Sequence, residues 1–392
     1  MKINFHSLFI VFLAFLLATA CNKDDQPAPP DQPEQPADTI PQGLPDSVWR
    51  HKSIQALVQM VFPDGNVFFG TASHYHLIGE ASGDTAFKEF NYITPANDFK
   101  QSYIHPEPDV YRWEKSDKWI AVSQDTGFIL RLHAPISPQC SPWVREDNRT
   151  PEELETMLNE YMDTLTAVYC HYPQVKWMDV VNETIDKATG NWFGPKPGTD
   201  KWENPWPIIG YDSSDLNFIV PKYIMMAFDI ANEKAPDVKQ IINQHGALEP
   251  YVWDKMKKLV QYLRDRGYRV DGIGWQAHVD LGWEKEEGSL ERLDEIVKWC
   301  HANNLEFHIT EFNVWLKPGD EYEYERQADT FYAITKVLLD NSDSGVVGIN
   351  FWHIGPEDTS NPQWDGTMWR SNLSPKPAYY KIKELIAGYY NP

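Results

Sequence analysis

The sequence is poor in the residue patterns that hold metal ions or disulfide frameworks. It contains four cysteines in 392 residues, and neither Cys-x-x-Cys nor His-Glu-x-x-His occurs, so no zinc site is indicated. If Cys21 is set apart, as argued below, three cysteines remain, and an odd number leaves at least one free thiol. We therefore expect no metal, no cofactor and no disulfide scaffold.

Positive charge is also scarce. The chain has 35 Lys and Arg against 57 Asp and Glu, and its formal net charge at pH 7 is -22. A protein that binds nucleic acid needs a basic surface, and an anionic membrane surface repels so acidic a chain. The composition argues against nucleic acid as a partner, and it leaves a membrane only through a covalent anchor.

Aromatic residues, by contrast, are abundant. They make up 14% of the chain, with 16 Trp and 19 Tyr. Flat aromatic faces suit ligands with apolar C–H surfaces, sugars among them, but a Trp-rich core explains the same composition. Hydrophobic residues at 42% and charged residues at 23% are typical of a folded globular protein.

The N-terminal segment, residues 1–20, is typical of a secretion signal. Lys2 supplies the charged start, and Leu8–Leu17 is an unbroken apolar run. This run is shorter than the ~20 residues that span a bilayer, but it fits the apolar part of a signal peptide. We therefore predict that residues 1–20 are removed.

The residues around Cys21 resemble a bacterial lipoprotein cleavage site, in which small residues precede a cysteine that becomes lipidated. The run Lys-Asp-Asp at 23–25 is similar to the surface-export signal of Bacteroidetes lipoproteins. The alternatives are an ordinary signal peptide with a stray cysteine, and a solvated charge run. Lipidation of Cys21 together with the export signal predicts an outer membrane lipoprotein exposed on the cell surface.

The segment that follows, residues 21–45, is rich in Pro, Asp, Gln and Ala and nearly free of apolar residues. Such a composition predicts an extended, disordered tether. No second Pro-rich linker and no short internal repeat is visible, so we expect residues 46–392 to form one catalytic domain. We expect the protein to act as a monomer.

Short apolar runs alternate with longer amphipathic patterns throughout this domain. One predicted helix starts at Thr150, with Pro151 at its first position and Glu153 three residues after the cap. Further helical patterns cover Leu216–Lys234, Pro250–Arg266, Leu290–Asn303, Glu323–Asp340 and Lys376–Gly388. The predicted strands are Asn66–Ala72, Phe90–Thr94, Gly127–His133, Val175–Val181, Val238–Asn243, Val270–Gln276, Leu305–Glu311 and Gly345–Trp352.

Eight strands with intervening helices predict an α/β fold, a (β/α)8 TIM barrel. The competing fold is a doubly wound open sheet, but no Gly-x-Gly-x-x-Gly follows a strand. The active site of such a barrel lies where the strands end, and seven of these ends are polar or aromatic. They carry Asn97 and Lys100, His133, Asn182 and Glu183, Asn243, Gln276 and His278, Glu311 and Asn313, and Trp352.

Two of these residues, Glu183 and Glu311, are carboxylates on the fourth and seventh strands, across the barrel mouth from each other. Glycoside hydrolysis needs two carboxylates, one to protonate the leaving oxygen and one to attack or to activate water. A single glutamate at a strand end is as readily a structural ion-pair partner. Two of them on opposite strands, among amides and aromatic residues, favour catalysis.

Several motifs around these residues identify a resemblance to glycoside hydrolase family 10, the xylanases. The family's fourth-strand motif is similar to Trp177–Glu183, its sixth to Asp271–His278 and its seventh to His308–Glu311. The start of the family's domain resembles Phe69–Ala72, Glu89–Asn91 and Thr94-Pro95, and its end resembles Pro375–Tyr379. The resemblance covers essentially the whole domain, in order.

The resemblance implies a retaining mechanism with Glu183 as general acid/base and Glu311 as nucleophile, ~5–5.5 Å apart. Asn182 would bind the sugar 2-hydroxyl, and His278 would hydrogen-bond Glu311 and keep it ionised. Glu183 would have to be protonated in the resting enzyme, which a negative Glu311 favours. The predicted substrate-binding residues are Asn97, Lys100, His133, Asn243, Gln276 and Trp352.

The chain also departs from the family pattern on the side that holds the sugar. Ala96 stands where the family has Glu, Asn313 where it has Asp, and His353 where it has Gly. The third strand ends in Arg131–Pro138, without the family's Trp-His pair and one residue shorter, and the fifth ends in Asn-Gln-His at 243–245 in place of Asn-Asp-Tyr. We expect Asn313 to support His278, although a neutral amide stabilises an imidazolium less than Asp does.

The resemblance predicts an endo-1,4-β-xylanase that cuts xylan outside the cell. Two alternatives stay open: a glycosidase of another β-linked polysaccharide or of decorated xylan only, and a non-catalytic glycan-binding surface lipoprotein. The long loop Asn191–Pro207, with Trp192, Trp202 and Trp206, builds an extra wall of the cleft or packs beneath it.

Overall fold

The computed structural model describes residues 43–391, apart from residues 147, 197–202, 318 and 360–363. The predicted signal peptide, the predicted lipidation site Cys21 and most of the predicted tether lie outside the described residues. Within the described part, no helix is long and apolar enough to cross a membrane.

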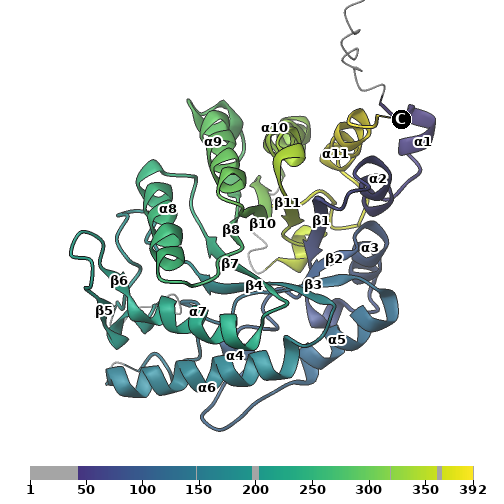
Figure 1. The fold of residues 1–392 in the computed structure, drawn as a ribbon. Helices are drawn as coiled ribbons and strands as arrows, with labels where there is room; N and C mark the ends of the chain where they lie inside the picture. The colour runs from purple at the N-terminus through teal and green to yellow at the C-terminus, as the bar shows by residue number, and fades with distance from the viewer. Residues whose placement is uncertain (1–42, 147, 197–202, 318, 360–363, 392) are drawn as a thin grey trace, which may run out of the picture. The chain divides into compact units, whose positions relative to one another are not determined.

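Eight parallel strands form a closed barrel at the centre of the fold, with helices around it (Figure 1). The strand order is β11, β1, β2, β3, β4, β7, β8, β10, and the pairing of β10 with β11 closes the ring. These strands are β1 (Val67–Ala72), β2 (Tyr92–Thr94), β3 (Ile129–Leu132), β4 (Val175–Asn182), β7 (Lys239–Gln244), β8 (Gly272–Trp275), β10 (Glu306–Trp315) and β11 (Val347–Phe351). All eight predicted strands and the predicted (β/α)8 barrel are therefore confirmed.

Three short strands lie outside this ring or extend it. Strand β9 (His278–Asp280) pairs in parallel with the end of β10, and β5 (Tyr211–Asp212) pairs antiparallel with β6 (Val220–Pro221). The α-helices are α1 (Asp46–Trp49), α2 (Ile54–Val61), α3 (Ala81–Glu89), α4 (Gln101–Ile104), α5 (Glu114–Thr126), α6 (Pro151–Tyr169), α7 (Lys222–Lys234), α8 (Pro250–Asp265), α9 (Ser289–Ala302), α10 (Tyr324–Asp340) and α11 (Pro377–Gly388).

The predicted start of α6 is confirmed in detail. The Thr150 hydroxyl accepts a hydrogen bond from the backbone N–H of Glu153 at 3.2 Å, and the Glu153 carboxylate accepts one from the N–H of Thr150 at 2.8 Å. The predicted start of α7 is wrong, because the helix begins at Lys222 and not at Leu216. The residues before it turn back so that β6 can pair with β5, and Leu216 stays 80% exposed.

Alternation along the strands separates two packed regions. On β4, Met178 and Val180 belong to the main hydrophobic core, whereas Trp177 packs in a separate cluster with Tyr92 and Ile241. Side chains of one strand alternate between its two faces, so the main core lies between strands and helices and the small cluster lies inside the barrel. Toward the C-terminal ends of the strands the barrel interior becomes polar, and the predicted site residues lie at that end.

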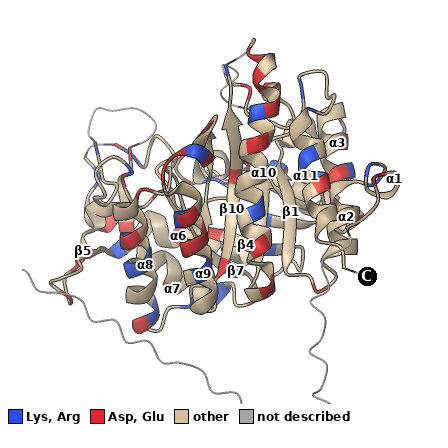
Figure 2. Cartoon of the chain, turned by 90° about the horizontal axis from the view of Figure 1, so that it is seen from above, with Lys and Arg blue, Asp and Glu red and all other residues tan. Residues whose placement is uncertain are grey.

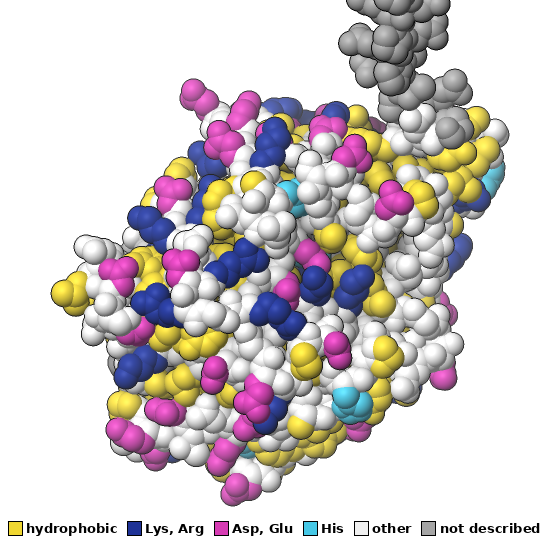
Figure 3. All heavy atoms as spheres, viewed as in Figure 1, with side chains coloured by type: hydrophobic (Ala, Val, Ile, Leu, Met, Phe, Trp, Pro, Cys, Tyr) yellow, Lys and Arg dark blue, Asp and Glu magenta, His cyan; other side chains and the backbone are white. Residues whose placement is uncertain are grey.

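The charged residues lie mainly on the helices and loops, while the barrel strands carry few of them (Figure 2). On the face seen in Figure 3, positive and negative side chains are interspersed. Cys140, Cys170 and Cys300 are free and buried. Burial raises the pKa of the Cys140 and Cys170 thiols to about 12, so these thiols are not reactive at neutral pH.

Candidate active site

The two predicted catalytic carboxylates lie at the same end of the barrel. Glu183 directly follows β4 and is 9% exposed, and Glu311 lies within β10 and is 5% exposed. The backbone φ of Glu183 is +57°, a left-handed conformation that costs a residue with a side chain ~1–3 kcal/mol. The backbone N–H of Glu183 donates to the carbonyl of Asn243 at 3.0 Å, which holds this conformation in place.

Three amide side chains connect the two carboxylates. Asn243 donates from Nδ2 to Asn182 Oδ1 and to Glu311 Oε1, both at 3.0 Å. Gln276 donates from Nε2 to Glu183 Oε1 at 2.9 Å, and Asn182 donates to the same oxygen at 3.3 Å. These amides come from β4, β7 and the end of β8, so barrel closure brings together residues predicted from separate strand ends.

Oε2 of Glu311 lies beside His278, and Asn313 in turn holds His278. His278 Nε2 lies 3.3 Å from Glu311 Oε2, and His278 Nδ1 lies 3.1 Å from Asn313 Oδ1. The Asn313 amide nitrogen donates to the carbonyls of Trp352 and Gly366, which fixes its oxygen toward the histidine. His278 Nδ1 must therefore donate, and a second proton on Nε2 is needed to hydrogen-bond Glu311 as a carboxylate.

A buried charge network lies beneath Glu311, and it contains the predicted binding residue His133 together with Asp179 and Arg131, whose pairing the sequence did not predict. Asp179 is fully buried and accepts from Arg131 Nε at 2.9 and 3.0 Å and contacts His133 Nδ1 at 2.8 Å. The other nitrogen of His133 lies 3.7 Å from Glu311 Oε1. The motif at residues 177–183 contains Asp179, but only the barrel register shows that Arg131, from the neighbouring strand, is its partner.

These contacts set the ionisation of Glu311. Burial raises the pKa of Glu311. The lowering by the charge of His133, the hydrogen bond and charge of His278 and the charge of Lys100 is larger, so the pKa lies below its ordinary value. Lys100 is 5% exposed and its Nζ donates to Gln139 Oε1. Glu311 is therefore a carboxylate at neutral pH, the form that a nucleophile needs.

The pKa of Glu183 differs from our expectation. Burial raises it, but a hydrogen bond and a charge from His245, a hydrogen bond from Gln276 and the charge of Lys100 lower it to about 2. His245 Nδ1 lies 3.3 Å from Glu183 Oε2. The expected resting protonation of Glu183 is therefore corrected, because the hydrogen bonds and charges of His245, Gln276 and Lys100 stabilise the carboxylate more than burial destabilises it.

The remaining predicted binding residues are arranged unequally around this pair. Trp352 is half-buried and lies edge-on to the rings of His133 at 5.6 Å and His278 at 6.1 Å. Asn97 is half-buried in the turn before α4, and within the described part of the chain its side chain makes no hydrogen bond to another predicted site residue. Trp352 thus lies against the two histidines that flank Glu311, whereas no such contact links Asn97 to the described part of the pair.

His353, which stands where the family pattern has Gly, packs against two further histidines. His353 is 2% exposed and stacks on His74 at 4.5 Å, and His74 stacks on His76 at 5.3 Å. Burial lowers the pKa of His353 well below its ordinary value, so it is neutral at neutral pH. The side chain added at this position is packed into the fold between the ends of β11 and β1.

The tryptophans of the loop 191–207 serve different purposes. Trp206 is fully buried, and its indole N–H donates to the carbonyl of Ser137 at 3.2 Å. The indole N–H of Trp192 donates to the carbonyl of Ile219 at 2.7 Å, and Lys255 lies over its ring. Trp202 lies outside the described residues. Of this loop's described aromatic rings, that of Phe193 lies 6.5 Å from the ring of His245, so the loop reaches the acid/base side.

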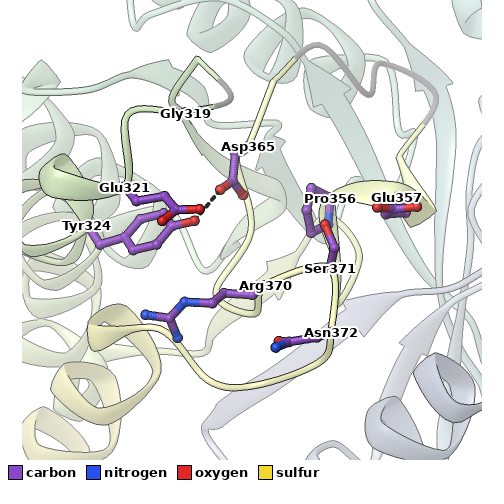
Figure 4. A pocket seen from close by; sticks show the side chains of 9 residues that line it. All are labelled: Gly319, Glu321, Tyr324, Pro356, Glu357, Asp365, Arg370, Ser371 and Asn372. Carbon is purple, nitrogen blue, oxygen red and sulfur yellow. Dashed lines mark hydrogen bonds between the residues drawn. The ribbon is translucent and has the colours of Figure 1, made fainter.

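A pocket of about 460 Å³ lies between the loops that follow β10 and β11 (Figure 4). Tyr324 donates to Asp365 across it at 2.8 Å, and Glu321, Glu357 and Arg370 contribute charged groups. None of the described residues that line it belongs to the predicted site. The chemistry is therefore placed in the carboxylate pair at the barrel mouth and not in this pocket.

The geometry suits acid–base and nucleophilic chemistry by side chains. In the part of the chain that the structure describes, no group of three His, Cys, Asp or Glu side chains is arranged to hold a metal ion. The two carboxylates are instead linked through Asn243 and Asn182, and such amides can also hydrogen-bond the hydroxyl groups of a sugar. Such a pair can cleave a glycosidic bond.

Comparison with known proteins agrees with this geometry. The curated relatives include endo-1,4-beta-xylanase B of Thermotoga neapolitana, 28% identical over 346 residues, which cover 84% of this chain and 88% of that protein. They also include the beta-1,4-xylanase of Dictyoglomus thermophilum, 28% identical over 315 residues, 75% of this chain and 82% of that protein.

Solved structures agree as well, and so does the family comparison. Native xylanase 10B from Thermotoga maritima superposes with a TM-score of 0.69 at 27% identity, covering 85% of this chain and 98% of that one. The sequence model of glycosyl hydrolase family 10 matches residues 56–385. Because this match spans nearly the whole barrel and includes both carboxylates, the chain belongs to glycosyl hydrolase family 10.

Proposed function

We propose that this glycoside hydrolase is a retaining endo-1,4-β-xylanase. The observation that carries the proposal is the pair of buried carboxylates at one end of the barrel, Glu183 after β4 and Glu311 within β10, which are linked by a network of amide donors. Retention requires two carboxyl groups too close for a water between them. The xylanase names of the relatives support the choice of substrate.

Glu311 would attack the anomeric carbon while Glu183 delivers a proton to the leaving oxygen, giving a covalent glycosyl-enzyme intermediate. Asn182, which contacts Glu183 and Asn243, is placed to bind the sugar 2-hydroxyl. Water would then hydrolyse the intermediate with Glu183 as the base. His278 and His133 would keep Glu311 ionised between turnovers.

The experiment that tests this proposal compares polysaccharides. Release of reducing sugar is measured on xylan, β-glucan and galactan, and the anomeric form of the first product is followed by NMR. We expect hydrolysis of xylan with retained configuration. Activity on another of the three would assign a different β-linked backbone, and no activity on any would favour a non-catalytic glycan-binding protein.

Decorated xylan is the finer substrate that we propose. Ala96 replaces an acidic side chain of the family pattern and is fully buried, and the third strand lacks the family's Trp-His pair. A site with fewer groups aimed at sugar hydroxyls discriminates less against substituents. We expect a higher kcat/KM on a substituted xylo-oligosaccharide than on the linear one of equal length; the opposite order would refute this refinement.

We propose that the enzyme acts at the outer surface of the cell as a lipoprotein. The motif before Cys21 and the acidic run after it support lipidation and export. The Pro-rich composition of residues 22–45 supports a tether that keeps the barrel away from the membrane. An acyl anchor contributes ~0.8 kcal/mol per buried CH₂, so several chains on one cysteine hold the protein stably.

A further inference from the structure

His245 is a second histidine at the carboxylate pair, and it belongs to one of the departures from the family pattern. It follows β7 directly, and its Nδ1 lies 3.3 Å from Glu183 Oε2. The preceding residue, Gln244, fixes this segment: its amide donates to the carbonyl of Ile185 at 2.8 Å and accepts from the N–H of Ile185 at 3.2 Å. The imidazole is therefore held against the loop that carries Glu183.

The two oxygens of Glu183 have different partners. Oε1 accepts from Gln276 and Asn182, which are amides and cannot carry an extra proton. Oε2 faces His245, which can. The oxygen that contacts His245 is thus the one at which a proton can be exchanged within the described site.

A general acid must hold or obtain a proton at the moment of bond cleavage. The hydrogen bonds and charges around Glu183 instead lower its pKa to about 2, so Glu183 by itself is deprotonated at neutral pH. If Glu183 is the acid of the proposed reaction, its proton must come from a neighbour within hydrogen-bond distance.

We propose that His245 shares the proton of the acid/base, so that Glu183 and His245 act as one proton-carrying pair. This inference rests on the proposed function, since it concerns the acid of the same reaction. His245 is a positioning residue: it acts through Glu183 and does not touch the bond that is cleaved.

The proton balance of the pair closes over one turnover. In the first step a proton passes from His245 Nδ1 through Glu183 to the leaving oxygen, while the glycosidic C–O bond breaks and Glu311 bonds to the anomeric carbon. In the second step water loses a proton to Glu183 and bonds to the same carbon as Glu311 leaves. That proton returns to His245, and the pair regains its starting state.

The surroundings of the imidazole leave Glu183 as its polar neighbour. His245 Nε2 is buried and, among the described residues, has no hydrogen-bond partner, and the ring edge faces Phe193. Among the described residues, the polar contact of this ring is therefore the one that Nδ1 makes with Glu183. The other charged groups that face Glu183 are Lys100, which acts through its charge, and Glu311, which is linked through Asn243.

Kinetics of two variants test the pair. His245→Phe removes hydrogen bond and proton site together, whereas His245→Gln keeps an N–H donor that cannot release its proton. The control is His171→Asn at an exposed position after α6. The measurement is kcat/KM against pH on a defined linear xylo-oligosaccharide, whose sugar leaving group needs a proton.

We expect the alkaline limb of the kcat/KM profile to move to lower pH by more than about one unit in both His245 variants, because the second site that retains the proton is lost. The control should match the wild type. An unchanged limb in both variants, or a shift in His245→Phe alone, would overturn proton sharing; a rise in KM with an unchanged limb would assign His245 to sugar binding instead.

A second measurement does not depend on activity. The protein is labelled with carboxyl-¹³C glutamate, and the Glu183 signal is assigned by its loss in Glu183→Gln. In His245→Phe this carboxyl should titrate about one unit higher than in the wild type, and equal titration would overturn the proposal. If the wild type cleaves no β-glycan, the proposed function fails, while the titration still decides whether the pair exists.

Discussion

Replacing Asp179 by Asn tests the buried charge network beneath the nucleophile. Asp179 and Arg131 are both fully buried, and the carboxylate accepts hydrogen bonds from Nε and Nη2 of Arg131 and contacts His133 at 2.8 Å. Asparagine has the same shape but no charge, so the guanidinium would remain inside the barrel without a counter-ion. Removing one partner of a buried pair costs ~3–5 kcal/mol.

This cost is a large part of the ~5–15 kcal/mol by which folded domains are stable. Denaturant unfolding followed by tryptophan fluorescence should therefore show a clearly lower midpoint for Asp179→Asn. The matched control is Asp125→Asn, the same change at an exposed carboxylate, which should stay within ~0.5 kcal/mol of the wild type. The double variant Arg131→Met with Asp179→Asn should lose less than the sum of the single variants, because no unpaired charge remains.

Activity provides a second readout of the same change. His133 would lose the partner that orients it toward Glu311, so kcat should fall even at temperatures where Asp179→Asn is folded. If Asp179→Asn were as stable as Asp125→Asn, the assignment of a buried, charge-paired network would be refuted. Additive losses in the double variant would refute the pairing of Arg131 with Asp179.

Three further outcomes follow from the site, the barrel interior and the leader. Glu183→Ala should stay folded and lower xylan hydrolysis by ~10²–10⁴-fold, and azide should restore activity in Glu311→Ala with inverted product; full activity in either variant would contradict the assignment. Glu306 has a pKa lowered to about 2, since hydrogen bonds and charges outweigh burial. Its stabilisation is therefore present above pH ~4.5 and lost as the pH falls toward about 2, so Glu306→Gln should show a flatter decline in acid unfolding experiments, and an unchanged decline would refute it. Cys21→Ala should remain unprocessed or leave the membrane fraction, and unchanged fractionation would refute lipidation.

The local pattern of the chain was sufficient for the elements of the fold. Strands buried on both faces read as nearly continuous apolar runs, so all eight were predicted, and the capping box at Thr150 located the start of α6. The start of α7 was predicted wrongly, because the pairing of Val220–Pro221 with Tyr211–Asp212 overrides the helical periodicity of residues 216–221. Helical propensity is a weak preference that tertiary pairing overrides.

The residue types of the catalytic pair were also visible in the sequence. Glu183 and Glu311 were predicted at the ends of two strands of one parallel barrel, and parallel strands end on the same side. The buried ion pair beneath them was not visible. Arg131 and Asp179 are 48 residues apart, and no local spacing relates them; their contact requires the register between β3 and β4, which also contains an irregularity between Leu130 and Arg131.

The same distinction applies to the ionisation of the acid/base. The sequence places a glutamate at the end of the fourth strand and a histidine after the fifth, and with those facts alone a raised pKa near another carboxylate was the natural expectation. The folded barrel brings His245 Nδ1 to 3.3 Å from Glu183 Oε2 and reverses the expected shift. The sequence determines which groups are present, whereas a pKa depends on distance and burial, and these are decided only when the barrel closes.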